Sequence, residues 1–391
     1  MKNSTQVEKI PFWLDPDKRA IAYQGLTVIM VGLLAWYLIS NTLTNLEKQN
    51  IASGFGFMDK EAGFEIGESL IPYSAADSYA RALVVGVINT LKVSVIGIIL
   101  CLVLGVFVGV SRLSDNWLVK KLAGIYIEFM QNIPILLQLF FWYALFYEAL
   151  PPVRQALNPF TGMYLCNRGL IMAVPTSHPV HLYMFIAFSL AIVGALILKS
   201  WARRRQESSG KDFPVSWTSF GMIIGLPLLV WASFDAPHTM DIPELKGFNF
   251  KGGLVLSPEF IALLLGLVIY TSAFVAEIVR AGIQAISRGQ TEAAMSIGLK
   301  KSLILNLVIL PQALRVIIPP LTSQMLNLIK NSSLAIAIGY PDFVSVTNTT
   351  INITGQSIEG VALIMGCYLT FSLSTSLFMN WYNKKSQLVE R

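Results

Sequence analysis

Eight apolar runs, each about as long as a membrane-spanning helix, restrict the fold of this chain more than any other feature. A bilayer core needs about 20 mostly apolar residues per helix. Only 13% of the residues are charged, whereas soluble domains carry roughly 25%. We therefore predict an all-α polytopic membrane protein with about eight transmembrane helices. The runs cover residues 21–39, 82–110, 125–150, 181–198, 220–234, 260–279, 313–338 and 358–379.

The run 313–338 contains two interruptions. Pro319-Pro320 removes two backbone donors, and Lys330-Asn331 places a charge within the apolar stretch. Prolines are tolerated in membrane helices where neighbouring groups satisfy the freed carbonyls. We expect this helix to bend or break at one of these positions.

Lysine and arginine set the predicted orientation, because cytoplasmic connections carry an excess of both. With the N-terminus inside, most of the 29 lysines and arginines fall on the inner side. Both termini, the connection 201–214 and the interval 288–311 are then cytoplasmic. The outer segment 41–81 is rich in Gly and Phe, and we expect it to lie on the membrane surface or to pack over the helices. The outer segments 151–180 and 235–257 are expected to be loops.

Composition argues against several classes of site. The net charge of +6 comes from cations in the connections between apolar runs, so nucleic acid is not an expected partner. The three cysteines and three histidines lack ligand or disulfide spacing, so we expect no metal site. The polar, proline-containing start of the chain does not read as a cleavable signal peptide, and the first apolar run should remain as an anchor.

The interval 288–311 is too long and too structured to be a simple turn between two membrane helices. Thr291 is an expected N-cap, with Glu292 at the positive end of the helix dipole. Gly298 should end this short helix, and residues 300–309 should form a second helical piece. Pro311 then fits the start of the next helix, where a missing N–H is tolerated. We predict a structured element on the cytoplasmic face, at which a soluble partner docks.

The spacing within this interval resembles the EAA signature of ABC importer permeases. Glu292-Ala293-Ala294 is followed after three residues by Gly298, and after nine more by Val308-Ile309-Leu310-Pro311. In that family an isoleucine is commoner than Val308. The resemblance assigns ATPase coupling to Glu292, Ala293, Ala294, Gly298, Leu310 and Pro311.

More narrowly, the chain resembles the polar amino-acid permeases of the histidine/glutamine/general L-amino-acid type. The segments that carry this resemblance are 89–100, 126–143, 273–294, 310–321 and 328–335. It implies a type I ABC importer transmembrane domain with one extra N-terminal helix and an inserted hairpin at about 181–235. The extra segments are similar to the larger permease subunit of the general L-amino-acid subgroup. Gln131 replaces an arginine usual in the family, which leaves open which group, if any, pairs with Glu128.

The resemblance also implies boundaries along the chain. They are a cytoplasmic segment (1–20), an extra first transmembrane helix (21–40), a periplasmic loop (41–81), the permease domain (82–381, with its EAA coupling loop at 288–311) and a cytoplasmic tail (382–391).

Such permeases work within a larger assembly in the bacterial inner membrane. The sequence contains no GxxxxGK[ST] phosphate loop, so ATP and Mg²⁺ are expected on a separate ATPase subunit, and the chain is not expected to be an enzyme. The resemblance implies two permease chains, two ATPase chains and a periplasmic amino-acid-binding protein. The subgroup favours a second permease that is a different chain.

Polar groups at membrane depth are costly and often functional. Glu277 and Arg280, at i and i+3, form either a self-satisfied pair or, with Glu128, part of a gate or a helix-pair contact. Candidates for the substrate path lie in two runs. They are Gln138, Gln324, Asn327, Lys330, Asn331 and Ser332. For Lys330 the alternatives are a lysine that snorkels to the interface and caps a helix end, and one that lines the path and meets a substrate carboxylate.

Two other classes compete with an ATP-driven importer. An ion-coupled secondary transporter needs a mid-membrane coupling acid and usually a repeated half. A membrane enzyme needs a cluster of His, carboxylate or Cys groups at one depth. The sequence displays neither pattern, and neither class needs a docking element at 288–311.

Overall fold

The structure is a computed structural model that describes residues 15–48 and 53–386. Most of the N-terminal segment 1–20 and the end of the tail 382–391 therefore lie outside the described residues. Contacts divide the chain into two compact units. The first unit comprises Met1–Ile127 and Thr271–Arg391, and the second comprises Glu128–Tyr270.

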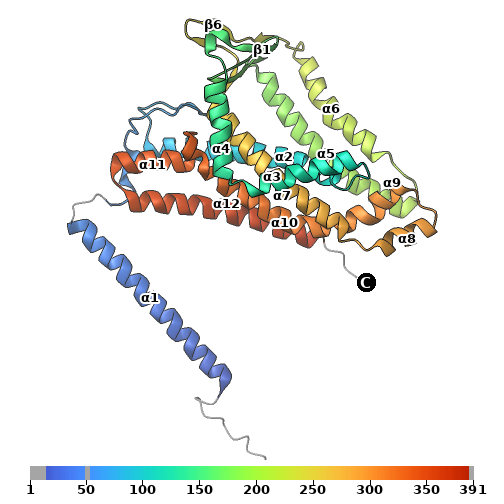
Figure 1. The fold of residues 1–391 in the computed structure, drawn as a ribbon, viewed down its shortest axis with the longest axis horizontal. Helices are drawn as coiled ribbons and strands as arrows, with labels where there is room; N and C mark the ends of the chain where they lie inside the picture. Colours follow the sequence, from blue (N-terminus) through green and yellow to red (C-terminus); the bar gives the residue numbers. More distant parts are fainter. Residues whose placement is uncertain (1–14, 49–52, 387–391) are drawn as a thin grey trace, which may run out of the picture. The chain divides into compact units, whose positions relative to one another are not determined.

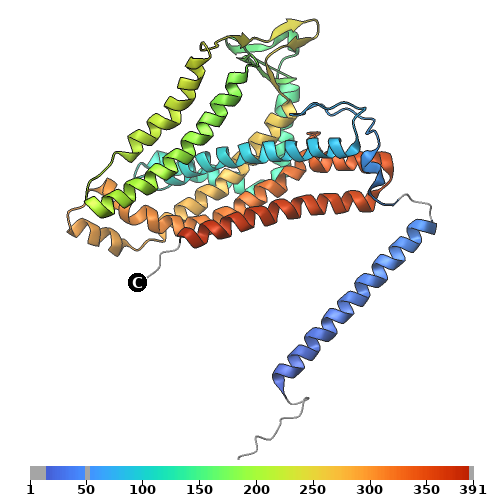
Figure 2. The same cartoon turned by 180° about the vertical axis from the view of Figure 1, so that it is seen from behind.

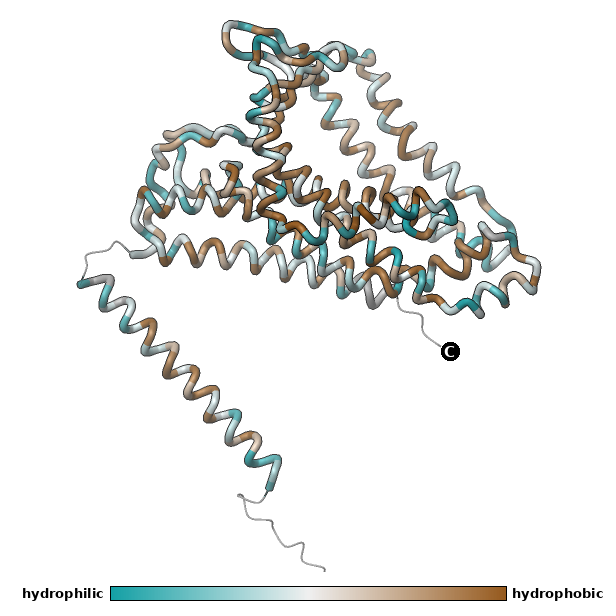
Figure 3. Tube along the Cα trace, in the orientation of Figure 1, coloured by the Kyte–Doolittle hydropathy of each residue, from teal (hydrophilic) through white to brown (hydrophobic). Residues whose placement is uncertain are grey.

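Long apolar helices dominate the part of the chain that the structure describes, as Figure 3 shows by their brown colour. Seven helical segments are long and apolar enough to cross a membrane, and a bent pair of helices makes an eighth. This confirms the predicted polytopic helical fold. The seven are α1 (Pro16–Lys48), α2 (Tyr79–Ser111), α5 (Pro179–Ser209), α6 (Val215–Ser233), α7 (Pro258–Gln284), the segment Ser302–Ile338 and α12 (Ser357–Ser386).

The third apolar run is not one straight helix, as the prediction of a single span over 125–150 implied. It forms α3 (Trp117–Asn132) and α4 (Ile135–Ala144), followed by a π-helical turn, and the pair is bent by 102°. Pro134 causes this bend, because it disfavours a helical residue before it and cannot donate a hydrogen bond itself. Its backbone is extended, with ψ of 134°.

The run 313–338 behaves differently at its two interruptions. Helix α10 (Leu310–Asn331) continues through Pro319-Pro320. At Ser332 the chain changes to a 3₁₀ helix, η6 (Ser332–Ile338). The expected interruption is therefore at Lys330-Asn331 and consists of a change of helix type.

Helices α2, α10, α11 (Phe343–Thr354) and α12 lie side by side in the first unit (Figures 1 and 2). Helix α2 also approaches α7 closely through glycines one helical turn apart. A Cβ atom added at Gly105 would lie 2.4 Å from Cγ1 of Val275, and one added at Gly109 would lie 2.6 Å from the carbonyl oxygen of Ala276. Small residues at this spacing let membrane helices pack with their backbones nearly in contact.

The outer loop after α1 packs on the first unit, which was one of its two predicted positions. Its 3₁₀ turn η2 (Phe55–Asp59) buries Phe57 in a cluster with Tyr79, Leu83 and Phe343. Aromatic side chains bury large apolar areas, so this cluster fixes the loop over the ends of α2 and α11.

Buried polar groups hold the start of α11 against α2. The Asn89 side chain donates to the carbonyl oxygens of Glu68, at 2.8 Å, and Pro341, at 2.9 Å. The backbone N–H of Phe343 donates to Thr90 Oγ1 at 3.0 Å. Asp342 caps α11 by accepting from the N–H of Ser345 at 2.9 Å, and burial raises the pKa of this carboxyl to about 7.

In the second unit, α5 and α6 form an antiparallel hairpin that rises to a group of short strands (Figure 1). The outer segments 151–180 and 235–257, expected to be loops, contain these eight strands. They are β1 (Leu157–Phe160), β2 (Met163–Cys166), β3 (Gly169–Met172), β4 (Val174–Pro175), β5 (Met240–Asp241), β6 (Glu244–Lys246), β7 (Asn249–Lys251) and β8 (Leu254–Leu256).

The strands form one four-stranded sheet, ordered β1-β2-β3-β8, and the pairs β4-β5 and β6-β7. Val153, Cys166 and Ile171 make a small core beneath them, and the rings of Tyr164 and Phe250 lie 4.5 Å apart. The strands were missed because each is short and because β3 pairs with β8 across the whole hairpin, so that the pairing has no local signal.

We predict that Gly109→Ala destabilises the protein by about 1–3 kcal/mol, because its Cβ would meet a backbone carbonyl that cannot rotate away. Gly366→Ala is the matched control, since nothing lies within 4 Å of the added atom. The control should be neutral or stabilising by up to about 1 kcal/mol, the gain in helix propensity. Thermal unfolding of the two variants in detergent checks this, and equal melting temperatures would contradict it.

Candidate functional site

The predicted docking element forms a short helix, α8 (Arg288–Ser296). Its N-cap position is Ser287, so Thr291 lies inside the helix and the prediction that it caps α8 was wrong. A helix can begin earlier here because Ser287 has the extended backbone that a cap position needs (ψ 138°). Glu292 consequently lies in the middle of α8 rather than in its first turn.

Helix α8 has one exposed face and one that packs on the chain itself. Glu292 and Ala293 are exposed, and the apolar side chains of Met295 and Ile297 are 50% and 75% exposed. Ala294 is only 5% exposed, and α8 packs against the helical segment that follows it. The exposed surface available to a partner therefore combines a carboxylate with apolar groups, while Ala294 anchors α8 within the chain.

Gly298 ends α8 as the sequence predicts. Its φ is +79°, in the left-handed region that other residues avoid. Its N–H donates to the carbonyl oxygen of Met295 at 2.9 Å, and that of Leu299 donates to Ala294 at 3.2 Å. These bonds close the helix end and redirect the chain.

The second helical piece follows, also as predicted. It consists of α9 (Lys301–Ile304) and a π-helical turn, η5 (Leu305–Ile309), which runs directly into α10. Pro311 lies in the first turn of α10. The wider π turn accommodates a proline, which lacks the N–H that an α-helix would use there.

Helix α7, which leads into α8, is packed tightly against α10, which leads out of the loop. A Cβ atom added at Gly282 would lie 2.2 Å from Cγ1 of Ile317. Ala313 and Ile317 are buried at this contact. Packed interiors resist deformation, so the α7 and α10 segments at this contact form one tightly packed pair.

Near the same end of α7, Glu277 and Arg280 form the ion pair that their spacing predicts. Arg280 Nε donates to Glu277 Oε2 at 2.9 Å, and a second guanidinium nitrogen bonds the other carboxylate oxygen. Arg280 also bonds the side chain of Gln284. The structure thus shows the self-satisfied pair, and a gating role for the pair stays a prediction. Glu128 lies in the second unit, where its carbonyl oxygen accepts from Asn132 at 2.6 Å.

Helix α10 presents a polar stripe within a membrane-length segment. Ser323, Asn327 and Lys330, at i, i+4 and i+7, are exposed on one face. Gln324 and Asn331 are half-buried beside them. In a membrane protein such a stripe lines an aqueous path or a subunit contact, because polar side chains are costly against lipid.

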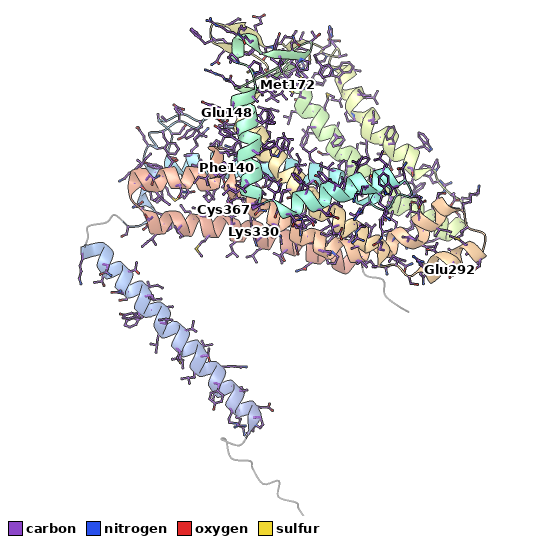
Figure 4. All side chains as sticks on the ribbon, viewed as in Figure 1. Phe140, Glu148, Met172, Glu292, Lys330 and Cys367 are labelled. Atoms are coloured by element: carbon purple, nitrogen blue, oxygen red, sulfur yellow. The ribbon has the colours of Figure 1, made fainter. Side chains whose placement is uncertain are left out.

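Lys330 lies at the rim of a cavity of about 720 Å³ in the first unit, away from Glu292 (Figure 4). Ser333 of η6 and Tyr368 of α12 also line it. Ser333 belongs to the polar break that the sequence predicts at Lys330. Tyr368 was not a candidate, because a single tyrosine in an apolar run gives no signal of its own. Ser332 is buried instead and donates to the carbonyl oxygen of Ile329 at 2.7 Å.

Gln138 has a structural position. Its side chain is 5% exposed and donates to the carbonyl oxygens of Met130, at 3.0 Å, and Ile133, at 3.1 Å. Both carbonyls belong to the helix end that the bend at Pro134 leaves unpaired. Gln138 therefore caps the broken span, and its contact with substrate stays a prediction.

Comparison with known proteins places this arrangement in a family. The family described as "binding-protein-dependent transport system inner membrane component" matches residues 213–387. The general L-amino acid transport system permease protein AapQ of Rhizobium johnstonii is 49% identical over 96% of this chain and 94% of its own length. This chain belongs to that family of transport permeases.

Two further relatives align over nearly the full length of these permeases. YhdX of Escherichia coli is 50% identical over 96% of both chains. The glutamate/glutamine/aspartate/asparagine transport system permease protein BztB of Rhodobacter capsulatus is 39% identical over 94% of this chain and 95% of its own. Relatives that include the first helix and the inserted hairpin support an ABC permease role over that of a secondary transporter.

We predict that Gln138→Leu, which is close in size, destabilises the protein by about 1–3 kcal/mol, because two part-buried carbonyls lose their donor. Asn327→Leu, an equally polar-to-apolar change on the exposed stripe of α10, should alter stability by less than about 0.5 kcal/mol. Thermal unfolding in detergent measures both. If the two variants melt alike, Gln138 does not support the bend.

Proposed function

We propose that this permease is the membrane-spanning subunit of an ATP-driven importer of amino acids, moved by separate ATPase subunits that dock on α8. The observation that carries the proposal is the exposed face of α8, with Glu292 and Ala293 between two helices that are packed together at Gly282 and Ile317. The chain lacks a phosphate-loop sequence of its own, so an ATP-driven step needs a partner.

Coupling follows from this geometry. When the ATPase subunits close, they displace α8, and the tight contact of α7 with α10 moves both helices as one body. The left-handed turn at Gly298 and the π turn η5 are the points at which the loop can change direction. Tilting of α10 then alters which side of the membrane its polar stripe faces. A second permease chain, expected to be different from this one, would complete the path.

Amino acids are the proposed substrate class because relatives of this length are named for amino-acid transport. Lys330, at the rim of the first-unit cavity with Ser333 and Tyr368, is the proposed partner for a substrate carboxylate. A soluble binding protein on the outer face would deliver the substrate to the bundle. On this proposal, both termini and α8 face the cytoplasm of a bacterium, and the strands of the second unit face the periplasm.

We predict that Glu292→Lys weakens retention of the ATPase subunit by at least about tenfold, the loss expected when a charge-assisted hydrogen bond is removed. ATP-dependent uptake should fall with it. Co-purification from solubilised membranes and uptake of labelled amino acids measure the two effects. Glu244→Lys, the same change at an exposed strand position of the second unit, is the matched control and should retain the ATPase. Normal retention and uptake in Glu292→Lys would exclude the coupling role.

We predict that Lys330→Met lowers amino-acid uptake about tenfold at subsaturating substrate, because the carboxylate loses a charge-assisted partner. Lys330→Arg keeps the positive charge and should retain most of the uptake. ATPase co-purification should be unchanged in both variants, since Lys330 lies away from α8. Full uptake by Lys330→Met would remove this residue from the substrate path without affecting the coupling proposal.

A further inference from the structure

Positive charge gathers at the end of α5 and in the connection that joins it to α6. Residues 199–212 include five cations and two carboxylates, a net charge of +3. We name these cations the basic cluster: Lys199, Arg203, Arg204, Arg205 and Lys211. The helix dipole places roughly half a negative charge at the C-terminus of α5. That charge balances only part of the net charge of +3.

The length of helix α5 places the basic cluster at a membrane surface. Helix α5 has 31 residues and is roughly 46 Å long at 1.5 Å per residue, whereas the hydrocarbon core is about 30 Å thick. Its apolar side chains end at Leu198, and the remaining turns extend beyond the core. Trp201 and Trp217 flank the connection and are exposed, as aromatic residues at a lipid–water interface are.

Aromatic rings hold one arginine of the basic cluster in place. The guanidinium carbon of Arg205 lies 5.3 Å from the ring centroid of Trp201 and 6.0 Å from that of Phe213. These two rings meet edge to face, 5.5 Å apart. A guanidinium stacked on ring faces is held in position while the edge of its fork still offers N–H donors to an anion.

The carboxylates of the connection are used away from this arginine. Glu207 accepts from Arg203 at 3.1 Å, and Asp212 accepts from the side chain of Gln206. These carboxylates do not line a cavity of about 540 Å³ at the same end of the hairpin. Its lining residues are Trp201, Arg204, Arg205, Ser208, Ser209 and Lys211. Three of these six residues are cations and none is a carboxylate. The hydroxyls of Ser208 and Ser209 both donate to the carbonyl oxygen of Arg205, so the cations are the groups that can bind an anion.

We propose that this cavity binds the phosphate head group of an anionic phospholipid in the cytoplasmic leaflet. The ligand is a lipid rather than a soluble phosphate because exposed apolar side chains, among them Leu196 and Ile197, stand on α5 just before the cavity. A head group at Arg204, Arg205 and Lys211 would place its acyl chains along this surface. Basic residues that border membrane helices favour anionic lipids in this way. The proposal depends on the membrane placement of α5 and α6 and is independent of which substrate is transported.

The test uses the full chain, purified in neutral detergent and titrated with dioleoyl-phosphatidylglycerol or dioleoyl-phosphatidylcholine, with bound lipid measured by native mass spectrometry. We expect phosphatidylglycerol to bind at least about tenfold more tightly than phosphatidylcholine. Arg204→Gln alone should weaken phosphatidylglycerol about fivefold, and the triple change Arg204→Gln, Arg205→Gln, Lys211→Gln should abolish the preference. The matched control removes three cations from the outer segments 151–180 and 235–257, with Arg154→Gln, Lys246→Gln and Lys251→Gln. It should bind the lipids like the unmodified protein.

Several results would overturn the proposal. Equal binding of the two lipids, or an equal loss in the control variant, would mean that the cavity has no selective site. Displacement of phosphatidylglycerol by inorganic phosphate at the same concentration would show a site for free phosphate instead. The single variant keeps the test decisive if the triple variant does not fold. Reaction of Ser208→Cys with a membrane-impermeant thiol reagent from the outside of intact cells would contradict the cytoplasmic placement, whatever the uptake activity.

Discussion

The lipid core offers no hydrogen bonds to the backbone, and the membrane-spanning part of this structure is arranged around that constraint. At two points where a helix breaks or changes type, a side chain of the chain itself supplies a donor. Gln138 donates to the carbonyls left at the bend before Pro134, and Ser332 donates at the change from α10 to η6. Where the constraint is met in this way, a polar residue in a span is structural.

The same constraint separates a second group of polar residues. Ser323 and Asn327 lie on one exposed face within α10, and Lys330 lies on the same face in the last turn of that helix. Polar side chains that are not needed by the backbone and are not buried indicate water or a protein partner on that face. Composition alone cannot separate the two groups, because both contain uncharged polar residues within apolar runs.

The closest helix contacts of the first unit are approaches at glycines rather than ion pairs. Gly105 and Gly109 bring α2 against α7, and Gly282 brings α7 against α10. Glu277 and Arg280, by contrast, satisfy each other within one helix. Such contacts are the physical basis of the coupling that we propose between α8 and the polar stripe of α10.

Much of this architecture could be predicted from the sequence. Apolar length identified the membrane helices, and the spacing from Glu292 to Pro311 identified α8, its end at Gly298 and the start of α10. The N-cap at Ser287 was missed because several polar residues there cap equally well. The bend at Pro134 was missed because a proline can also begin a straight helix. The strands of the second unit were missed because each has only two to four residues, and because β3 and β8 are adjacent only after the hairpin has folded.

The pairing of β3 with β8 has a consequence for how such a chain could have been assembled. Leu170 pairs with Leu256 in the sheet, so the two ends of the segment that contains α5 and α6 lie next to each other. A segment whose two ends lie close together can be inserted or removed as one piece, because the elements on either side keep their spacing. The hairpin, its basic connection and its strands are in this sense a removable module within the permease domain.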